Sequence, residues 1–354
     1  MYIPIPNSVQ WMLAIFSVVT TVGYFIEKVP RLVQYFREPS VKDAPKSTSE
    51  YLVGSALALL CAAIWAASYA SLDLISPLVG TLDINIHLMG FAAASLYVGS
   101  VVAARFKPAS PPDGATAWQG GRLAILVVAN LGNFIFSVWA LSFISVSEAM
   151  TLNNLSPLLL ALALWYRGKL TVSVGTFIAL ALVLLGAFIV NIDSGFVLRT
   201  GDNIRGSLIA VAAGASFALW TFTMDELRAS FTSIAVRMRT LAFIFFVSYV
   251  VLITYGYFAS GHSLLTTRDY IILSLNGVRV AFVHVLYTFA VQKAGALLAS
   301  VILVLMVPLT FPFDNIWNQA TISAQLIIGA TLIVLAAVGL LSDELRRAQV
   351  TGSQ

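Results

Sequence analysis

Charged side chains are scarce in this sequence. Asp, Glu, Lys and Arg make up 10% of its 354 residues, whereas hydrophobic residues make up 59%. A soluble domain has about 25% charged residues, and apolar runs of about 20 residues, each long enough to cross a bilayer, recur along this chain. The composition therefore excludes a soluble globular protein and predicts an all-α polytopic membrane protein.

Cysteine and catalytic motifs are also nearly absent. Cys61 is the only cysteine, which excludes an internal disulfide and a cysteine-based metal cluster. The sequence has no HExxH motif, no GxxxxGKS/T loop, no Ser/His/Asp arrangement and no dense carboxylate motif, so we expect no enzyme activity, no metal and no cofactor. Its basic residues are scattered, which argues against a nucleic-acid partner despite the net charge of +4.

Apolar segments that could span a membrane occur along the whole chain. An early one, Val9–Ile26, has no basic residue before it and five basic residues between Lys28 and Lys46, unlike a secretory signal peptide. We interpret it as an uncleaved anchor that either spans the membrane or lies at its surface. Ten core segments follow at about 52–73, 84–104, 122–143, 147–166, 172–192, 206–224, 234–257, 270–291, 295–317 and 322–342.

Basic residues fall at alternate connections between these segments. The positive-inside rule places such residues, with the stretch Lys28–Lys46, in the cytoplasm, so we expect both ends of the core there. Asp225 and Glu226 are interpreted as cytoplasmic loop charges at the end of the sixth core span. The opposite loops keep only Arg199, Arg205 and Arg268. The basic residues expected inside are Arg105, Lys107, Arg122, Arg167, Lys169, Arg228, Arg237, Arg239, Lys293, Arg346 and Arg347.

Two parts of the sequence share one pattern. In each part the first helix contains a tryptophan, a later helix ends on an alanine, and the helix after a short polar joint reaches a proline. Each part has five spans, an odd number, so the second is inserted in the opposite orientation, as in many secondary transporters. We expect an N-terminal hydrophobic helix and basic linker in residues 1–50, repeats in 51–196 and 197–345, and a cytoplasmic tail in 346–354. The shared residues are Trp65, Ala140 and Pro157 in one part and Trp220, Ala290 and Pro308 in the other.

These features resemble the drug/metabolite transporter superfamily, with two EamA-type repeats, over about Tyr51 to Leu345. The family has Gly-Glu-Arg/Lys-Leu-Thr after the fourth helix. This chain reads RGKLT there, with Gly168 in place of the glutamate, and NQATIS in the second half, so it departs from the pattern in both repeats. The resemblance implies a ten-helix bundle, here with one extra N-terminal helix, whose first, third, fourth, sixth, eighth and ninth core helices enclose a central cavity.

Polar residues gather on the third and fourth core helices. Asn130, Asn133 and Ser137 share one helical face, and Asn154 lies on the next helix. An amide within lipid is costly unless it is paired. These residues therefore either join helices to one another or line a substrate cavity, and the two interpretations are compatible.

The eighth core helix has a second polar face. Asn276, Arg279 and Tyr287 are expected there as substrate-binding residues. Arg279 either holds a carboxylate or phosphate of the substrate, or it snorkels to the surface or pairs with a carboxylate such as Glu148. Glu148 and His284 are candidate coupling residues; the alternatives are a helix-start carboxylate for Glu148 and a packed, hydrogen-bonded side chain for His284.

Aromatic residues and prolines complete the candidate site. Trp65, Tyr69 and Trp220 lie on the first helix of each half, where they either pack between helices or contact the substrate. Pro157 and Pro308 each remove a backbone hydrogen bond within a span, so we predict that both are hinges.

The sequence thus predicts a secondary active transporter, an exporter or exchanger, that moves a small organic metabolite by alternating access. An amino-acid-like or anionic substrate is favoured because of Arg279. The alternatives are a flippase for a lipid-linked substrate and a non-transporting, membrane-embedded enzyme or accessory subunit of an envelope lipid pathway. The expected partners are the metabolite and membrane lipids, a homodimer is left open, and the expected location is a bacterial inner membrane.

Overall fold

The structure is a computed structural model that describes most of the chain from Ser47 onward. The predicted anchor Val9–Ile26 and the basic linker after it lie outside the described residues. The described residues are 47–72, 74–75, 79–106, 120–144, 146–170, 173–190, 202–228, 231, 233–258, 265–310, 312 and 323–352.

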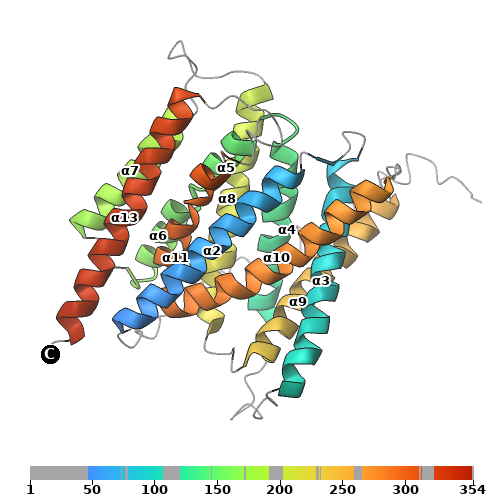
Figure 1. The fold of residues 1–354 in the computed structure, drawn as a ribbon, viewed down its shortest axis with the longest axis horizontal. Helices are drawn as coiled ribbons and strands as arrows, with labels where there is room; N and C mark the ends of the chain where they lie inside the picture. The colour runs from blue at the N-terminus through green and yellow to red at the C-terminus, as the bar shows by residue number, and fades with distance from the viewer. Residues whose placement is uncertain are drawn as a thin grey trace, which may run out of the picture.

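The secondary structure of these residues is helical, as the sequence predicts (Figure 1). A short helical stretch at residues 306–310 follows the helix α11. The helices are α2 (Thr48–Leu72), α3 (Thr81–Phe106), α4 (Gly120–Ala140), α5 (Val146–Asn153), α6 (Ser156–Tyr166), α7 (Val174–Val190), α8 (Asp202–Leu227), α9 (Ile234–Phe258), α10 (Thr267–Ala294), α11 (Ala296–Leu303) and α13 (Ala324–Gly352).

Seven helices in the described part of the chain are long and apolar enough to cross a membrane. Three shorter apolar helices, Val174–Gly186, Ala296–Thr310 and Ile327–Ala336, occur beside them. For the described residues, these findings confirm an all-helical structure with helices able to span a membrane, whereas the count of ten core spans stays a prediction. The last helix, α13, continues to Gly352 and therefore through most of the predicted tail.

Local sequence signals fix the ends of α10. The Thr266 hydroxyl accepts a hydrogen bond from the Asp269 amide (3.2 Å), and the Asp269 carboxylate accepts one from the Thr266 amide (3.0 Å), which is a capping box. The helix ends at Gly295, whose φ of 94° is open to glycine but strained for other residues. This glycine lets the chain turn directly from α10 into α11.

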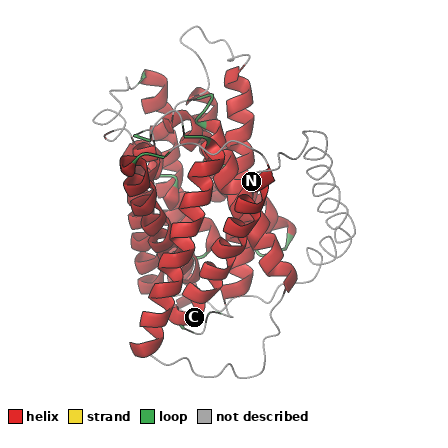
Figure 2. Ribbon diagram, turned by 90° about the vertical axis from the view of Figure 1, so that its right-hand side faces the viewer, coloured by secondary structure: helices red, strands yellow, loops and turns green. Residues whose placement is uncertain are grey.

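Helices from the two predicted halves pack against each other in pairs. α2 packs on α10, α3 on α9, α4 on α8, and α7 on α13 (Figure 1). Figure 2 shows that most helix axes lie roughly along the length of the bundle. We call the end at the bottom of Figure 1, where α2 and α9 begin and α3, α8 and α10 end, the lower end, and the opposite end the upper end.

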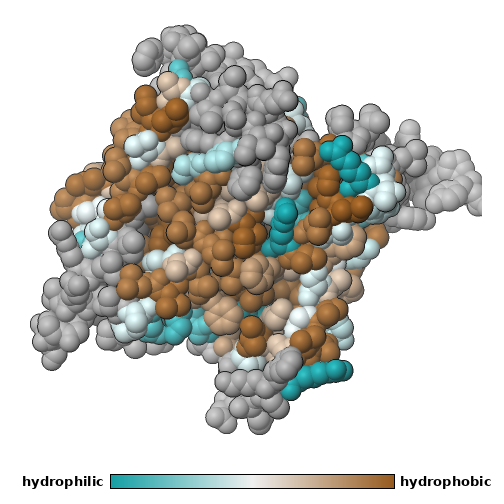
Figure 3. All heavy atoms as spheres, in the orientation of Figure 1, coloured by the Kyte–Doolittle hydropathy of each residue, from teal (hydrophilic) through white to brown (hydrophobic). Residues whose placement is uncertain are grey.

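The distribution of side chains is suited to lipid on the outside. Large apolar side chains such as Val174, Phe177 and Leu208 are 66–78% exposed, while Asn130 and Asn276 are each 1% exposed. Figure 3 shows apolar residues covering most of the described surface on one face of the bundle. This arrangement follows from a lipid environment, in which apolar side chains face the hydrocarbon and amides face other helices.

Small residues allow some helices to approach closely. A Cβ atom on Gly214 of α8 would overlap the Asn153 carbonyl oxygen at the end of α5, whereas a Cβ atom on Gly339 of α13 would meet nothing within 4 Å. Close approach at small residues replaces the hydrophobic driving force that helices lack within lipid.

Gly214→Ala should therefore lower the stability of the folded protein by about 1–3 kcal/mol, because α5 must move away from α8. The matched variant Gly339→Ala makes the same chemical change without a clash and should be neutral or slightly stabilising. Thermal unfolding of both purified variants in detergent measures the difference. Equal midpoints would show that this contact between α5 and α8 does not constrain the bundle.

Candidate functional site

The fourth core span is broken in its middle. α5 ends at Asn153, a turn covers Asn154 and Leu155, and α6 begins at Ser156. Pro157 lies at the start of α6, where its missing N–H costs least. The sequence predicts a bend caused by this proline, and the break lies within one turn of it.

The predicted ninth core span is broken in the same way. α11 ends at Leu303, a turn covers Val304 and Leu305, and helical residues resume at Met306, two residues before Pro308. In both breaks the second turn residue donates its amide to the carbonyl three residues earlier. The hydrogen bonds are Leu155 N to Leu152 O (3.1 Å) and Leu305 N to Ile302 O (3.0 Å).

The two adjacent amides at the first break have different partners. Asn153 donates from Nδ2 to the Ser137 hydroxyl on α4 (3.3 Å), and Ser137 donates to Asn133 Oδ1 (3.3 Å). Asn154 donates to the Met150 carbonyl of its own helix (2.6 Å). Asn153 therefore joins α5 to α4, while Asn154, the amide proposed from the sequence, stabilises the broken helix.

Buried amides on α4 and α10 also reach other helices. Asn130 donates from Nδ2 to the Ser248 hydroxyl of α9 (3.1 Å). Asn276 donates from Nδ2 to the Ser71 hydroxyl of α2 (2.9 Å) and to the Ile272 carbonyl (3.1 Å). The bonds to Ser248 and Ser71 cross between the two predicted halves, so polar pairing holds the halves together inside the bundle.

A small cavity lies among these polar residues. Its volume is about 20 Å³, which is room for about one water molecule. Five of its lining residues are Ser68 and Tyr69 of α2, Ser137 of α4, and Asn276 and Val280 of α10. The small volume means that the polar centre of the bundle is nearly closed. All five positions lie in the upper half of their helices, so this centre is displaced toward the upper end.

An aromatic cluster surrounds His284 of α10. The imidazole is T-shaped to Trp65 (5.4 Å between centroids), Trp220 (5.2 Å) and Phe245 (4.9 Å), and it stacks on Phe134 (5.8 Å). Its Nδ1 lies 2.8 Å from the Val280 carbonyl oxygen, so Nδ1 is the protonated donor.

Tyr287 belongs to the same cluster. Its ring lies 6.0 Å from those of Trp65 and Trp220 and 5.4 Å from that of Phe217, and its hydroxyl lies 3.3 Å from the Thr221 hydroxyl of α8. The cluster thus joins α2, α8 and α10 between the cavity and the lower end.

Several buried polar atoms near this centre have no hydrogen-bond partner among the described residues. They are Ser68 Oγ, Asn130 Oδ1 and Trp220 Nε1. An unsatisfied buried polar group is costly, and such groups are therefore uncommon in native proteins. Two acceptors and a donor are available here to a ligand with complementary polar groups.

Arg279 is placed differently from Asn276. It lies 12 residues after the start of the 28-residue helix α10, near mid-height. Its side chain is half-buried, and Leu275 and Phe282, one turn away on the same side, are 53% and 52% exposed. No hydrogen bond or ion pair of Arg279 occurs with another described residue, whereas Asn276 is fully engaged within the bundle.

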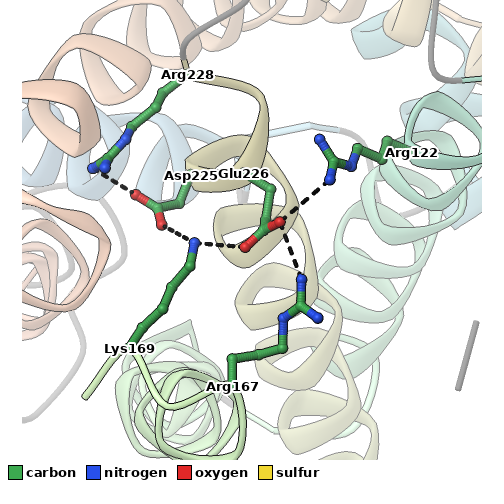
Figure 4. A network of polar contacts seen from close by, with 6 residues as sticks. All are labelled: Arg122, Arg167, Lys169, Asp225, Glu226 and Arg228. Carbon is green, nitrogen blue, oxygen red and sulfur yellow. Dashed lines mark hydrogen bonds and ion pairs between the residues drawn. The ribbon is translucent and has the colours of Figure 1, made fainter. Parts of the chain in front are cut away.

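Two carboxylates near the end of α8 organise the lower end (Figure 4). Glu226 lies 3.5 Å from Arg122 of α4, 3.3 Å from Arg167 at the end of α6, and 2.5 Å from Lys169. Asp225 lies 3.2 Å from Lys169. The anions belong to the second predicted half and these cations to the first, so the network joins the halves.

The network is largely shielded from solvent. The side chains of Arg167, Asp225 and Glu226 are 3%, 5% and 7% exposed. Arg228 also pairs with Asp225 (3.2 Å), and burial lowers the pKa of its guanidinium from the usual value. The interpretation of Asp225 and Glu226 as loop charges was therefore wrong, because both lie in the last turn of α8 and pair with cations whose side chains are at most 21% exposed.

A second ion pair at the lower end is more exposed. Lys293 at the end of α10 lies 2.7 Å from Glu50 in the first turn of α2, and both side chains are about 40% exposed. It joins α10 to the start of α2, but solvent screens such a pair strongly.

The structure brings together most residues selected from the sequence, in two groups. Trp65, Tyr69, Ser137 and Asn276 line the small cavity, and Asn133 bonds to Ser137 beside it. Trp65 also belongs to the aromatic cluster, with Trp220, His284 and Tyr287. Asn130 lies nearby with Ser248; Arg279 is not joined to either group. The sequence interpretation missed Ser71, Asn153, Ser248, Phe134 and Phe245. Glu148 is partly buried in the first turn of α5, as expected of a helix-start carboxylate.

Comparison with known proteins agrees with this architecture. Residues 52–192 match the EamA-like transporter family, which confirms the resemblance to drug/metabolite transporters. The match indicates a membrane transporter of this type rather than an enzyme. No curated protein matches the chain in sequence.

The fold also occurs among solved structures, with 29 matching chains. One of them, described only as the crystal structure of a protein, has a TM-score of 0.61 at 14% identity and covers 84% of this chain and 96% of that chain. A likeness at this level of identity shows a shared fold alone.

The buried network gives a stability prediction. Glu226→Gln removes the charge that Arg167 and Lys169 share, and breaking a buried pair from one side costs about 3–5 kcal/mol. Because Glu226 retains some exposure, we expect a loss toward the lower value, seen as a lower thermal midpoint. The matched variant Glu50→Gln, at the exposed pair, should change the midpoint little. Similar shifts for both variants would contradict a special role for the buried network.

The helix breaks give a kinetic prediction. Pro157→Ala restores an amide donor and allows α5 and α6 to form one continuous helix, so we expect slower turnover with an unchanged thermal midpoint. Pro308→Ala should act in the same direction. Flux measured in proteoliposomes at equal protein density would test this, and unchanged rates in both variants would remove the prolines from the mechanism.

Proposed function

We propose that the chain is a secondary transporter that moves a small organic metabolite by alternating access between two inverted five-helix repeats. The transporter class rests on the EamA-like match over residues 52–192. The repeats, the alternating mechanism and the substrate class are inferences from the arrangement of the described helices.

The helix pairs support the inverted repeats. The repeats predict that α2 corresponds to α8, α3 to α9, α4 to α10 and α7 to α13. Exchanging corresponding helices turns the packed pair α2–α10 into the packed pair α8–α4, and leaves the pairs α3–α9 and α7–α13 unchanged. A two-fold relation between the halves produces this result. The equivalent breaks after Asn153 and Leu303 support the same relation, and five spans per half would invert the second half.

One observation supports alternating access most directly. The buried ion pairs that join the halves lie at the lower end, whereas the polar cavity lies toward the upper end. Closure at one end, with a site displaced to the other, is the arrangement of one half of a transport cycle. Loss of the Glu226 contacts to Arg167 and Lys169 would open the lower end and produce the other conformation of the transport cycle.

The chemistry of the centre favours an uncharged or zwitterionic polar metabolite with an apolar or aromatic part. Ser68, Tyr69, Ser137 and Asn276 offer hydroxyl and amide groups, and the aromatic cluster offers an apolar surface. Arg279, which suggested an anionic substrate, lies beside exposed apolar residues, and we assign it to the alternative of snorkelling. The cavity must widen to admit such a ligand, which requires the halves to move.

Two other functions remain alternatives. A flippase for a lipid-linked substrate needs a lateral path from lipid to the polar centre. A large groove does exist between α3 and α9, but it shares no lining residue with the central cavity. A membrane-embedded enzyme or accessory subunit would show no flux at all, so reconstitution separates it from a transporter.

The proposal is tested with ligand and flux together. A thermal-shift screen of metabolites on the purified protein identifies a ligand, because binding to the native state raises its apparent stability. Asn276→Ala should abolish the ligand-induced shift and the flux into proteoliposomes, whereas Arg279→Ala should retain both. Loss of binding and flux in Arg279→Ala, with both retained in Asn276→Ala, would instead support an anionic substrate held by Arg279. Ligand binding without flux in the wild type would contradict a transporter.

A further inference from the structure

A long apolar groove runs between α3 and α9. Its volume is about 910 Å³, and its lining extends from Asp83 to Tyr97 on α3 and from Arg239 to Ile253 on α9. Each of these stretches rises by about 21 Å along its helix. Only 39% of the spanning window of α3 and of α9 is buried, as for α2, against 56% for α4, α8 and α10. Among these less buried helices, α3 and α9 are the two that border the groove, and the described residues cover them incompletely there.

The surface of the groove fits a further helix. Small residues, Gly90, Ala93, Ala94 and Ala242, line its length, and small residues let membrane helices approach closely. Large aromatic residues, including Phe246, stand beside them. This alternation of small and large side chains is a surface into which the side chains of a helix can fit.

We propose that the apolar segment Val9–Ile26 spans the membrane and docks into this groove as an additional helix of the bundle. The segment has 18 residues, about 27 Å as a helix, which covers the length of the groove. Its C-terminal end leads through Glu27–Lys46 to Ser47, at the lower end, where α2 begins. The segment therefore descends parallel to α3.

The linker is long enough for this position. The packed series α2–α10–α3–α9 places the groove about 30 Å from the start of α2, at about 10 Å for each neighbouring pair. The 20 residues from Glu27 to Lys46 span up to about 70 Å when extended. The connection thus crosses the lower end without strain.

Charge complementarity fixes the direction of the segment. Arg239 lines the lower end of the groove, is exposed, and has no ion-pair partner among the described residues. Glu27 directly follows the segment and would meet this arginine when the segment descends to the lower end. A phospholipid tail or a second copy of the chain could also fill an apolar groove. The segment is favoured over both because its length matches the groove and Glu27 matches the charge of Arg239.

Cysteine cross-linking in the full-length protein tests the docking. Cys61 is buried and is the only native cysteine, so Cys61→Ala gives a background without thiols. Phe16, Ser17, Val18 and Val19 are replaced by cysteine one at a time and combined with Ala94→Cys, at mid-height in the groove. We expect an intramolecular cross-link only from those of the four positions that lie on the helical face turned toward the groove.

The matched control uses the same four positions with Leu335→Cys on α13, which is also near mid-height and is 53% exposed. It should give no cross-link. Absence of any product with Ala94→Cys in folded protein would overturn the proposal, as would products between two chains, which would assign the groove to a second copy. A phospholipid retained by the purified protein together with absent cross-links would assign it to lipid.

A charge exchange provides the second test. Glu27→Arg and Arg239→Glu should each lower the thermal midpoint, and the double variant should recover most of the loss. Combining Glu27→Arg with Arg268→Glu, at the upper end, should give no recovery. Additive losses in the exchanged pair would overturn the assigned direction of the segment. Neither test measures transport, so their failure is distinct from failure of the proposed function.

Discussion

A polar side chain inside a bilayer has no water with which to bond, so its partner must come from the protein. The architecture of this bundle depends on that constraint. Asn276 bonds to Ser71, and Asn130 bonds to Ser248, and each bond joins the two predicted halves. Such bonds are worth about 1 kcal/mol each within a membrane, weak enough to exchange for bonds to a substrate.

The ion pairs at the lower end also depend on partners within the protein, and losing those partners costs more free energy than losing a neutral hydrogen bond. Removing a charge from water costs several kcal/mol, which is recovered only while the partners stay together. Glu226 meets cations that come from two other helices, so moving any one of those helices separates charges. Under the proposed mechanism, the network would favour two discrete arrangements, closed with the pairs formed or open with the charges hydrated, over intermediate ones. A transporter requires such two-state behaviour at each end.

The helices and the breaks near the prolines could be predicted from apolar runs and from the missing proline amide. The partners of particular polar residues could not. Asn153 and Asn154 are adjacent and point about 100° apart, so the helical period alone does not say which faces α4. Arg279 lies one turn from Asn276, yet the packing of α10 leaves Asn276 buried and Arg279 only half-buried. Glu226 meets Lys169 across 57 residues of sequence, a contact that only the fold creates.

The central claim is that the halves open alternately at the two ends. Spin labels at Val174 and Ile234 report on the lower end, and labels at Ser142 and Arg268 report on the upper end; all four side chains are exposed. Distances between the labels are measured in proteoliposomes for the wild type, with and without ligand, and for Glu226→Gln. The account predicts that the lower distance lengthens as the upper distance shortens. Single, unchanged distances at both ends under all three conditions would contradict it.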